Sequence, residues 1–391
     1  MQFFSYLATL GLQENQYQEK PVSMNHHLHL LQLDLYLHDY KFALLCFITA
    51  FVVTLITIPP IISLVKKYRL YDMPGVRKEH TEPIPTLGGI AIVAGLMTSM
   101  FLWFPLGTQI PQVSFFFSIV ALFALGIMDD LKDLSAKYKF IVQIALASLI
   151  ALSGIRITSF DGLFGIYELP VSAQFTFTVL AITGITNAFN LIDGIDGLAG
   201  GLGFMSLITL GIFLTISGDI NTALIAFGLA GAMFAFLFFN FNPAKIFMGD
   251  TGSLVLGFVI AVLGIRLMQM NVMAPNPVVL NAPVFVLGIV LIPVFDTIRV
   301  FALRIWKGKS PFEADKTHIH HLLTNAGFNH NFAAKLICFL HGFILIEVYW
   351  LRALQPELIL GILIVFMLLS VVVLKNMGAL LRKNKPSHSA A

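Results

Sequence analysis

Eleven apolar segments separated by short polar stretches constrain the fold of this chain more than any other feature of its sequence. A helix that crosses a membrane needs about 20 predominantly apolar residues, and somewhat fewer or more when it is tilted. Of the 391 residues, 57% are hydrophobic and only 12% are charged, so no stretch can form a separate soluble core. We therefore predict an all-α, polytopic membrane protein with about eleven transmembrane helices. The predicted spans are 42–64, 88–104, 113–128, 140–155, 171–188, 198–216, 222–241, 254–270, 278–301, 333–351 and 358–374.

The basic residues predict the orientation of these spans. With the N-terminus outside, most of the 24 Lys and Arg fall in loops on the cytoplasmic side. The opposite loops between spans carry only Arg352 and, at a span edge, Arg156. Because Lys and Arg are enriched in cytoplasmic loops, we expect the N-terminus outside and the C-terminus in the cytoplasm.

The same pattern divides the chain into an N-terminal extension (1–40), a transmembrane domain (41–375) and a basic cytoplasmic tail (376–391). The extension lacks the basic start and long apolar core of a cleavable signal. Met24 opens a shorter reading frame that keeps every predicted span, so Met1 and Met24 both remain candidate starts.

One polar stretch, NAFNLIDGIDGL at 187–198, interrupts the apolar pattern. In an α-helix, residues three apart drift by about 60° per step, so the first and last of four would lie on opposite sides. Gly194 and Gly197 also weaken the helix there. We expect a helix that unwinds into a polar loop with its acceptors turned towards one site, and a capped helix end is the alternative. The four acceptors are Asn187, Asn190, Asp193 and Asp196.

A second acidic cluster, Asp129, Asp130 and Asp133, follows the third predicted span. Like charges at positions i and i+4 of a helix repel each other. Such crowding indicates a metal or acid–base site. A plain ionic network with the nearby Lys132, Lys137 and Lys139 stays open as the alternative.

Two further loops on the predicted cytoplasmic side carry polar motifs. Asp250 lies in a glycine-rich turn at a helix N-terminus, where a carboxylate suits a hard cation that bridges phosphates. Nearby, Phe247 is interpreted either as interfacial packing or as a platform for a base. In the loop 302–332, the histidine cluster HIHH at 318–321 lies among basic residues, which favours a phosphate contact over a zinc site or no role.

The first cytoplasmic loop, 66–89, is the most basic one. Its charge is explained by topology and by attraction to anionic lipids. Gly88 and Gly89 add a second interpretation, because free N–H groups at a helix N-terminus bind anions. Inside the spans, the acids are few: Asp296 and Glu347. Polar groups confined to one membrane face indicate a lipid head group meeting a soluble molecule there, whereas a transporter more often places them near the midplane.

With these motifs in order, the chain resembles the polyprenyl-phosphate N-acetylhexosamine-1-phosphate transferases, and among them the bacterial undecaprenyl-phosphate GlcNAc-1-phosphate transferases. The resemblance runs from about residue 42 to residue 380. It rests on four motifs: MDDLKD (128–133), NAFNLIDGIDGL (187–198), KIFMGDTGSLVLGF (245–258) and KGKSPFEADKTHIHHLL (307–323).

The resemblance implies transfer of GlcNAc-1-phosphate from UDP-GlcNAc to undecaprenyl phosphate, with release of UMP and with Mg²⁺ or Mn²⁺ as cofactor. It implies a multi-pass protein of the inner (plasma) membrane with a cytoplasmic active site, at the first membrane step of a cell-surface polysaccharide such as O-antigen. Its partners would be the two substrates and the bilayer, without nucleic acid, and a homodimer is left open.

The residue roles also follow from the resemblance. We expect catalytic roles for Asp129, Asp130, Asp193, Asp196 and His321. Metal binding is assigned to Asp250 and Asp130. Substrate binding is assigned to Asn187, Asn190, Asn240, Phe247, Arg304, His318, His320, Lys78 and Thr86.

Three alternatives remain. The same chemistry would serve another UDP-N-acetylhexosamine, or a phospho-MurNAc-pentapeptide translocase, although translocases carry three successive histidines where this chain has HIHH. The alternative from a different class is a lipid transporter.

Overall fold

The computed structural model describes residues 22–68, 71–72, 84–105, 109–241, 243–274, 277–310 and 317–383. The described part is helical apart from one small antiparallel sheet, in which β1 (Tyr71–Asp72) pairs with β2 (Ile84–Pro85). The chain forms two compact units, Met1–Lys41 and Phe42–Ala391. The helix packing described below is that of the second unit.

Each of the eleven predicted spans coincides with a helix, and the ninth coincides with a pair of helices. The helices are α2 (Val22–Tyr68), α3 (Gly88–Trp103), α4 (Ile110–Lys132), α5 (Ala136–Leu152), the 3₁₀ turn η1 (Leu163–Gly165), α6 (Val171–Ile192), α7 (Leu198–Ile216), α8 (Ile220–Asn240), α9 (Gly249–Met273), α10 (Ala282–Ile289), α11 (Leu291–Trp306), α12 (Ile319–Asn325), α13 (His330–Leu351) and α14 (Pro356–Lys383).

The structure confirms the all-α polytopic class. Among the described residues, 8 helices are long and apolar enough to cross a membrane, and the bent pair α10 and α11 brings the number to 9. The helices α3 and α5 are shorter, with 16 and 17 residues. The count of eleven crossings and the orientation therefore stay predictions.

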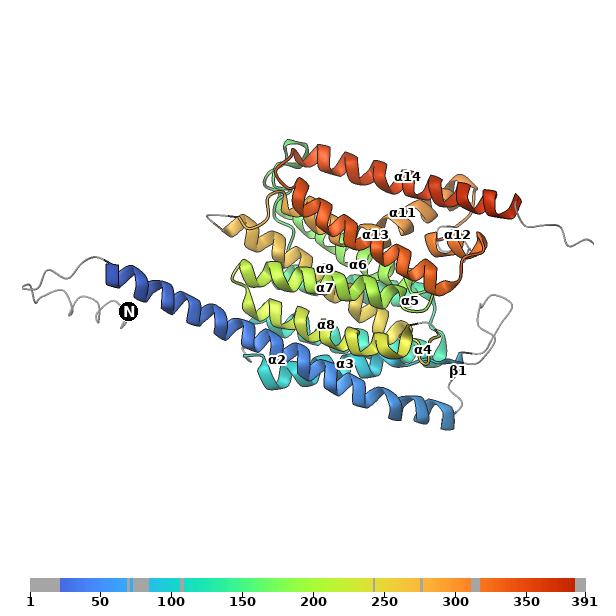
Figure 1. Ribbon diagram of the computed structural model, residues 1–391, viewed down its shortest axis with the longest axis horizontal. Coiled ribbons are helices and arrows are strands. Elements are labelled where there is room, and N and C mark those ends of the chain that lie inside the picture. Colours follow the sequence, from blue (N-terminus) through green and yellow to red (C-terminus); the bar gives the residue numbers. More distant parts are fainter. Residues whose placement is uncertain are drawn as a thin grey trace, which may run out of the picture. The chain divides into compact units, whose positions relative to one another are not determined.

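The helix α9 forms the core of the second unit. Of its most apolar stretch, 94% is buried inside the protein, which agrees with a sequence that is apolar on every side. The helices α3, α4, α6 and α7 pack against it. In Figure 1, the bundle helices run side by side, and α12 and the end of α4 lie towards the right-hand end.

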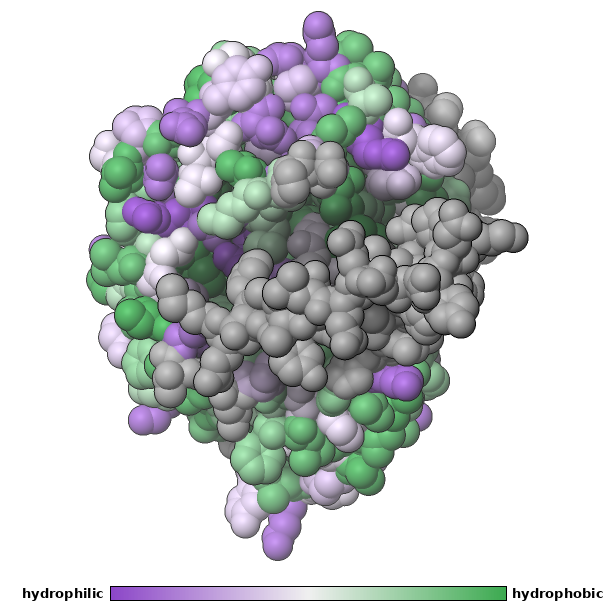
Figure 2. Space-filling view, turned by 90° about the vertical axis from the view of Figure 1, so that its left-hand side faces the viewer, coloured by the Kyte–Doolittle hydropathy of each residue, from purple (hydrophilic) through white to green (hydrophobic). Residues whose placement is uncertain are grey.

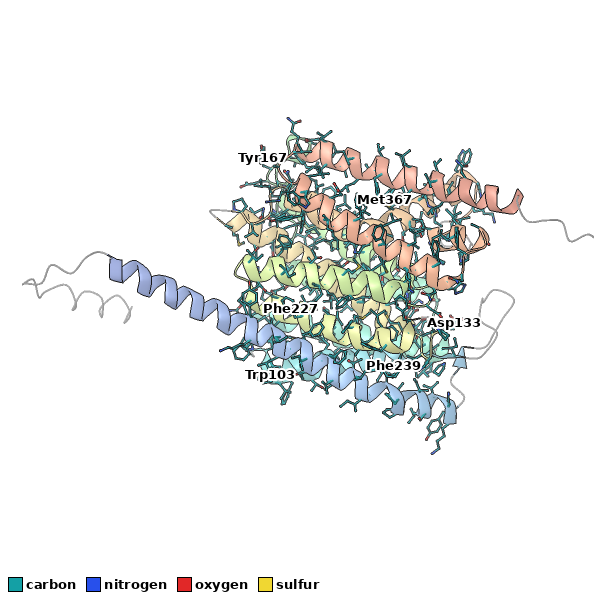
Figure 3. The ribbon with its side chains drawn as sticks, in the orientation of Figure 1. Trp103, Asp133, Tyr167, Phe227, Phe239 and Met367 are labelled. Atoms are coloured by element: carbon teal, nitrogen blue, oxygen red, sulfur yellow. The ribbon has the colours of Figure 1, made fainter. Side chains whose placement is uncertain are left out.

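The outer helices expose apolar side chains along their flanks, as helices in contact with lipid do. In α14, the exposed side chains include Leu358, Val365 and Leu368. Figure 2 faces the left-hand end of Figure 1 and shows hydrophilic residues gathered over the upper part of that end. Trp103 and Tyr167 lie near this end, whereas Asp133 and Phe239 lie near the opposite one (Figure 3).

The bend between α10 and α11 has an identifiable cause. The two helices meet at an angle of 78°. Pro293 has no N–H, so the carbonyl of Ile289, four residues earlier, cannot receive its helical hydrogen bond. The hydroxyl of Ser206 in α7 donates to this carbonyl at 3.1 Å, and His341 Nε2 lies 3.1 Å from the same hydroxyl. The break is thus closed by side chains of neighbouring helices.

The segment before α3 is tied to the segment before α9 by backbone hydrogen bonds. The N–H groups of Gly88 and Gly89 donate to the carbonyls of Phe247 and Met248, each at 2.9 Å. The N–H of Phe247 donates to the carbonyl of Pro85 at 2.8 Å. These N–H groups are therefore used within the protein and do not bind an anion, which was the second interpretation of this loop.

This contact demands glycine at position 89. A Cβ atom there would lie 2.2 Å from the backbone nitrogen of Gly252 in α9, so α3 and α9 touch backbone to backbone. We expect Gly89→Ala to lower the free energy of unfolding by about 1–3 kcal/mol or more, because overpacking of this size forces backbone shifts.

Gly184→Ala is the matched control for this prediction, because a Cβ atom at this helical glycine meets nothing within 4 Å. It should be neutral or slightly stabilising. Thermal melting in detergent compares the two variants, and equal melting temperatures would contradict the backbone contact.

Candidate active site

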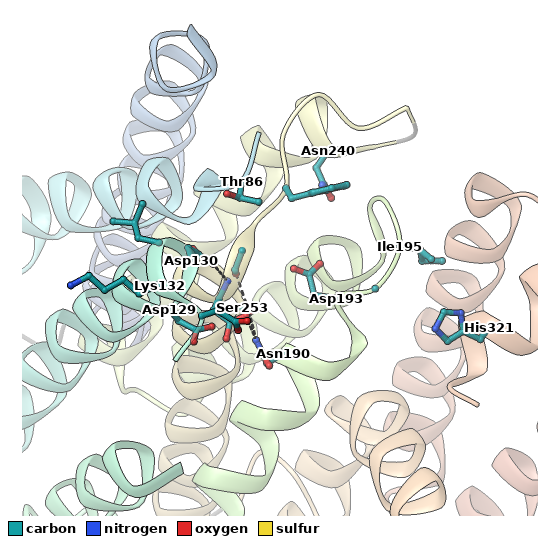
Figure 4. A pocket seen from close by; sticks show the side chains of 16 residues that line it. Thr86, Asp129, Asp130, Lys132, Asn190, Asp193, Ile195, Asn240, Ser253 and His321 are labelled. Carbon is teal, nitrogen blue, oxygen red and sulfur yellow. Dashed lines mark hydrogen bonds between the residues drawn. The ribbon is translucent and has the colours of Figure 1, made fainter. Parts of the chain in front are cut away.

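A cleft of about 930 Å³ opens at the end of the bundle where α4 ends and α9 begins (Figure 4). It brings together nine of the residues selected from the sequence: Thr86, Asp129, Asp130, Asn190, Asp193, Asn240, Phe247, Asp250 and His321. It is also lined by Leu131, Lys132, Asp133, Gly194, Ile195, Gly249 and Ser253. In Figure 4, Asp129 and Asp130 lie on one side of the cleft and His321 lies on the other, with Asp193 between them.

Lys139 links two of the carboxylates that line the cleft. Its Nζ lies 2.9 Å from Asp129 Oδ2 and 2.8 Å from Asp250 Oδ2. The other oxygen of Asp129 accepts a hydrogen bond from the N–H of Leu134 at 2.8 Å. Of the ionic network that the sequence left open, the pair of Lys139 and Asp129 is present, and Lys139 also reaches Asp250, 111 positions along the chain.

Asp130 caps the N-terminus of α9 from a different helix. Its Oδ1 accepts from the N–H of Asp250 at 2.8 Å, and its Oδ2 accepts from the N–H and the hydroxyl of Thr251 at 3.1 and 2.5 Å. A Cβ atom at Gly249 would lie 2.6 Å from this carboxylate. An anion is favourable at this end of a helix dipole, so Asp130 positions the first turn of α9.

Asp250 receives a further hydrogen bond from α6. The amide of Asn190 donates to Asp250 Oδ1 at 2.9 Å and lies 2.9 Å from Ser253 Oγ. One turn earlier, Asn187 donates to Gln143 of α5 at 2.5 Å. Asn187 is thus part of the packing behind the cleft and does not line it.

The stretch 193–197 is non-helical, as the sequence analysis expected. Asp193 ends α6 and lines the cleft. Asp196 faces the other way: it is 3% exposed, and its Oδ2 accepts from the N–H of Ala244 at 3.0 Å. The expectation that all four acceptors turn towards one site therefore holds for Asn190 and Asp193 only. Asp196 joins this loop to Ala244, and Asn187 packs against α5.

Asn240 holds the same loop from α8. Its Oδ1 accepts from the N–H of Gly197 at 2.9 Å, and its Nδ2 donates to the carbonyl of Ile246 at 2.9 Å. Gly197 has a φ of 77°, a left-handed conformation that glycine adopts without strain. Asn240 lines the cleft while joining its two neighbouring loops.

The histidine cluster contributes to the cleft unequally. His321 lines it, whereas His318 and His320 are buried. His320 packs against the Asp193 loop, because a Cβ atom at Gly194 would lie 2.6 Å from its Nε2. Burial lowers the pKa of His320 to about 3, so this side chain is neutral at physiological pH. Arg304 is buried and does not line the cleft, and Lys78 lies outside the described residues.

The contact of Lys139 with Asp250 was not predicted from the sequence, which placed Lys139 only in a local network. A signal was available, because Lys139 and Gln143 are four residues apart and share one face of α5. Both side chains reach polar partners in neighbouring helices.

The donors in the cleft suit a hard divalent cation. Among the described residues, no three His, Cys, Asp or Glu side chains form a preassembled metal cluster. Mg²⁺ commonly takes only one or two carboxylates together with phosphate oxygens of a substrate. Asp250 and Asp129 offer such oxygens around one point, which the Lys139 ammonium occupies.

We predict an unusual pH dependence of stability from Asp193. Burial, and then the nearby carboxylates of Asp250, Asp130 and Asp196, raise its pKa to about 7, from 3.8. The folded state therefore holds this proton more tightly than the unfolded state. The resulting stability is fully present below pH 4 and is lost as the pH rises to about 7.

Asp193→Asn removes this titration, so at pH 8 in chelator it should melt above wild type, and the gap should close towards pH 4. Asp133→Asn, which changes an exposed carboxylate, is the control and should follow wild type throughout. If the melting temperatures of wild type and Asp193→Asn change with pH in the same way, the raised pKa of Asp193 is contradicted.

Comparison with known proteins agrees with this geometry. Glycosyl transferase family 4 matches residues 112–268. The chain is 35% identical over 347 residues to a probable undecaprenyl-phosphate N-acetylglucosaminyl 1-phosphate transferase of Bacillus subtilis, which covers 87% of this chain and 94% of the relative.

Two undecaprenyl-phosphate alpha-N-acetylglucosaminyl 1-phosphate transferases are also similar. That of Yersinia pestis is 33% identical, covering 69% of this chain and 74% of the relative. The enzyme of Escherichia coli K12 is 32% identical, and the match covers 70% of this chain and 74% of the relative. The family match includes the aspartates of the cleft from Asp129 to Asp250. The chain belongs to glycosyl transferase family 4 and is a membrane-bound sugar-phosphate transferase.

Proposed function

We propose that this protein transfers GlcNAc-1-phosphate from UDP-GlcNAc to undecaprenyl phosphate, giving undecaprenyl-diphosphate-GlcNAc and UMP. We place the reaction on the cytoplasmic face of the inner membrane, at the first membrane step of a cell-surface polysaccharide such as O-antigen. The observation that carries the proposal is the cluster of carboxylates around Lys139 at the end of a lipid-exposed bundle. The relatives' names supply the substrates.

The charge of the cleft supports a requirement for Mg²⁺ or Mn²⁺. Asp129, Asp130, Asp193 and Asp250 all line it, and both proposed substrates are phosphate anions. Two like charges about 4 Å apart repel each other by several kcal/mol at a protein surface. Lys132 and Lys139 cannot offset this repulsion. A bound divalent cation would supply the missing positive charge, with Asp250 as its protein ligand. Asp130, the other metal ligand expected from the sequence, already accepts hydrogen bonds at both oxygens.

We assign different roles to the two neighbouring aspartates of α4. Both oxygens of Asp130 accept hydrogen bonds from the first turn of α9, so Asp130 acts as a positioning residue. Asp129 is held by Lys139 and is proposed to accept the last proton of the lipid phosphate. Because the second pKa of a phosphate ester is near 6, this demand on a base is mild.

The reaction exchanges one phosphoanhydride bond for another, so positioning and charge neutralisation matter more than a strong nucleophile. An oxygen of the lipid phosphate attacks the sugar-bearing phosphorus, the new phosphoanhydride forms, and the bond to UMP breaks. We propose that Phe247 and Thr86 contact the nucleotide and that His321 contacts the phosphates from the opposite wall (Figure 4).

Measuring UMP release also tests the alternative sugar donors and the alternative class of protein, a lipid transporter. Another UDP-N-acetylhexosamine, or UDP-MurNAc-pentapeptide as used by a translocase, would need the same charge arrangement. A lipid transporter would release no nucleotide. The deciding experiment measures UMP release by purified protein with undecaprenyl phosphate and a panel of UDP-sugars. Activity with UDP-GlcNAc supports the proposal, and turnover of a different donor alone, or of none, rejects it.

We predict that Asp250→Asn loses nearly all turnover, because the variant removes a carboxylate from the proposed cation site. The wild type should stop on addition of a chelator and recover with Mg²⁺ or Mn²⁺. Glu168→Gln removes an exposed carboxylate far along the chain from the cleft motifs and should keep wild-type activity. Full activity of Asp250→Asn, or of wild type in chelator, would exclude the metal role.

A further inference from the structure

Asp296 is the most enclosed acid near the cleft, and the proposed function does not use it. It lies in α11 and is 1% exposed. Its carboxylate accepts hydrogen bonds from His318 Nδ1 at 2.8 Å, from the N–H of Ile319 at 3.1 Å and from Arg299 Nη2 at 2.7 Å. Arg299 also donates to the carbonyl of Thr317. One buried ion pair thus holds three consecutive residues, 317–319.

These three residues lead directly into the histidines of the cleft. The N–H of Ile319 belongs to the first turn of α12, which carries His320 and His321. The rings of His318 and His320 are parallel within 7°, with centroids 5.7 Å apart. The rings of His320 and His321 are 4.3 Å apart.

The chain of contacts then reaches the acidic loop. His320 packs against Gly194, the residue after Asp193, so closely that a Cβ atom would lie 2.6 Å from its ring. A shift of α12 would therefore move His321 and press on, or release, the Asp193 loop. When groups that contact a substrate are displaced by about 1 Å, the rate of the reaction can fall about a hundredfold.

A contribution to the stability of the fold does not by itself explain why this ion pair is present. A buried salt bridge often contributes no more than apolar packing of the same volume, because its desolvation is costly. Fixing one arrangement of neighbouring groups is a better account of a carboxylate with three donors. Because a carboxylate accepts, the proton of His318 is held on Nδ1.

We propose that Asp296 is a positioning residue for the transfer reaction, which holds His320 against the Asp193 loop and His321 at the cleft through His318 and the start of α12. This inference rests on the proposed function for its kinetic part only. The segment 317–321 is the element through which Asp296 acts.

The first experiment needs no activity. Hydrogen–deuterium exchange of peptides covering 317–325 is compared between wild type, Asp296→Asn and Asp219→Asn. Asp219 is a matched control, because it also pairs with an arginine, Arg266, at 2.6 Å and also caps a helix, α8. We expect exchange at least tenfold faster in Asp296→Asn and unchanged in Asp219→Asn. Equal protection of this segment in all three proteins overturns the proposal.

A second variant covers the case in which Asp296→Asn does not fold. His318→Gln removes the imidazole but keeps the pair of Asp296 and Arg299. It should speed exchange in the same segment. If His318→Gln leaves 317–325 as protected as in wild type, the proposed route through His318 is wrong.

The kinetic experiment is a double-mutant cycle with His321→Ala. We expect Asp296→Asn to lower kcat at least tenfold, and His321→Ala to cost less in that background than in wild type, because both act through one unit. If the factors by which the two substitutions lower kcat simply multiply in the double variant, the positioning role is wrong. If wild type releases no UMP from UDP-GlcNAc, the proposed function fails, while the exchange result still decides whether Asp296 holds the segment.

Discussion

Lys139 lies between Asp129 and Asp250, and the arrangement of the cleft depends on this contact. Five aspartates line the cleft at the end of a bundle whose interior is apolar, where mutual repulsion is only weakly screened. A single ammonium group joins the end of α4 to the start of α9 and keeps the two at hydrogen-bonding distance. It marks the position where additional positive charge is most favourable. The chemistry proposed here follows from that imbalance of charge.

Two aspartates, Asp130 and Asp296, each cap the first turn of a helix other than their own. Asp130 of α4 accepts from the first turn of α9, and Asp296 of α11 accepts from the first turn of α12. In each case the acceptor comes from a different helix. Caps of this kind couple the position of one helix end to another element, whereas a local N-cap would satisfy only its own backbone. Such caps fix the relative positions of residues that are distant in sequence.

Much of this arrangement was predictable from the sequence, and the limits have physical causes. Runs of apolar residues located every long helix, because a span must be long and apolar, but they predicted neither α12 nor the break between α10 and α11. Acidic and histidine motifs located most of the cleft residues. The motif could not distinguish Asp193, which lines the cleft, from Asp196, which supports it, because a three-residue offset in a non-helical loop does not specify direction. The partners of Lys139 and Asp296 depend on tertiary packing: the shared face of Lys139 and Gln143 indicates a polar side of α5 but does not specify which residues it meets.

The break between α10 and α11 has a consequence for how this protein can move. A proline break is commonly regarded as a point of weakness, since one backbone carbonyl is left without its donor. Here Ser206 of α7 supplies that donor to Ile289, and His341 of α13 lies beside it. Bending further at this point would detach a carbonyl in a region without water, at a cost of several kcal/mol. The hydrogen bond from Ser206 therefore favours the observed angle between α10 and α11, and with it the position of α11, which carries Asp296.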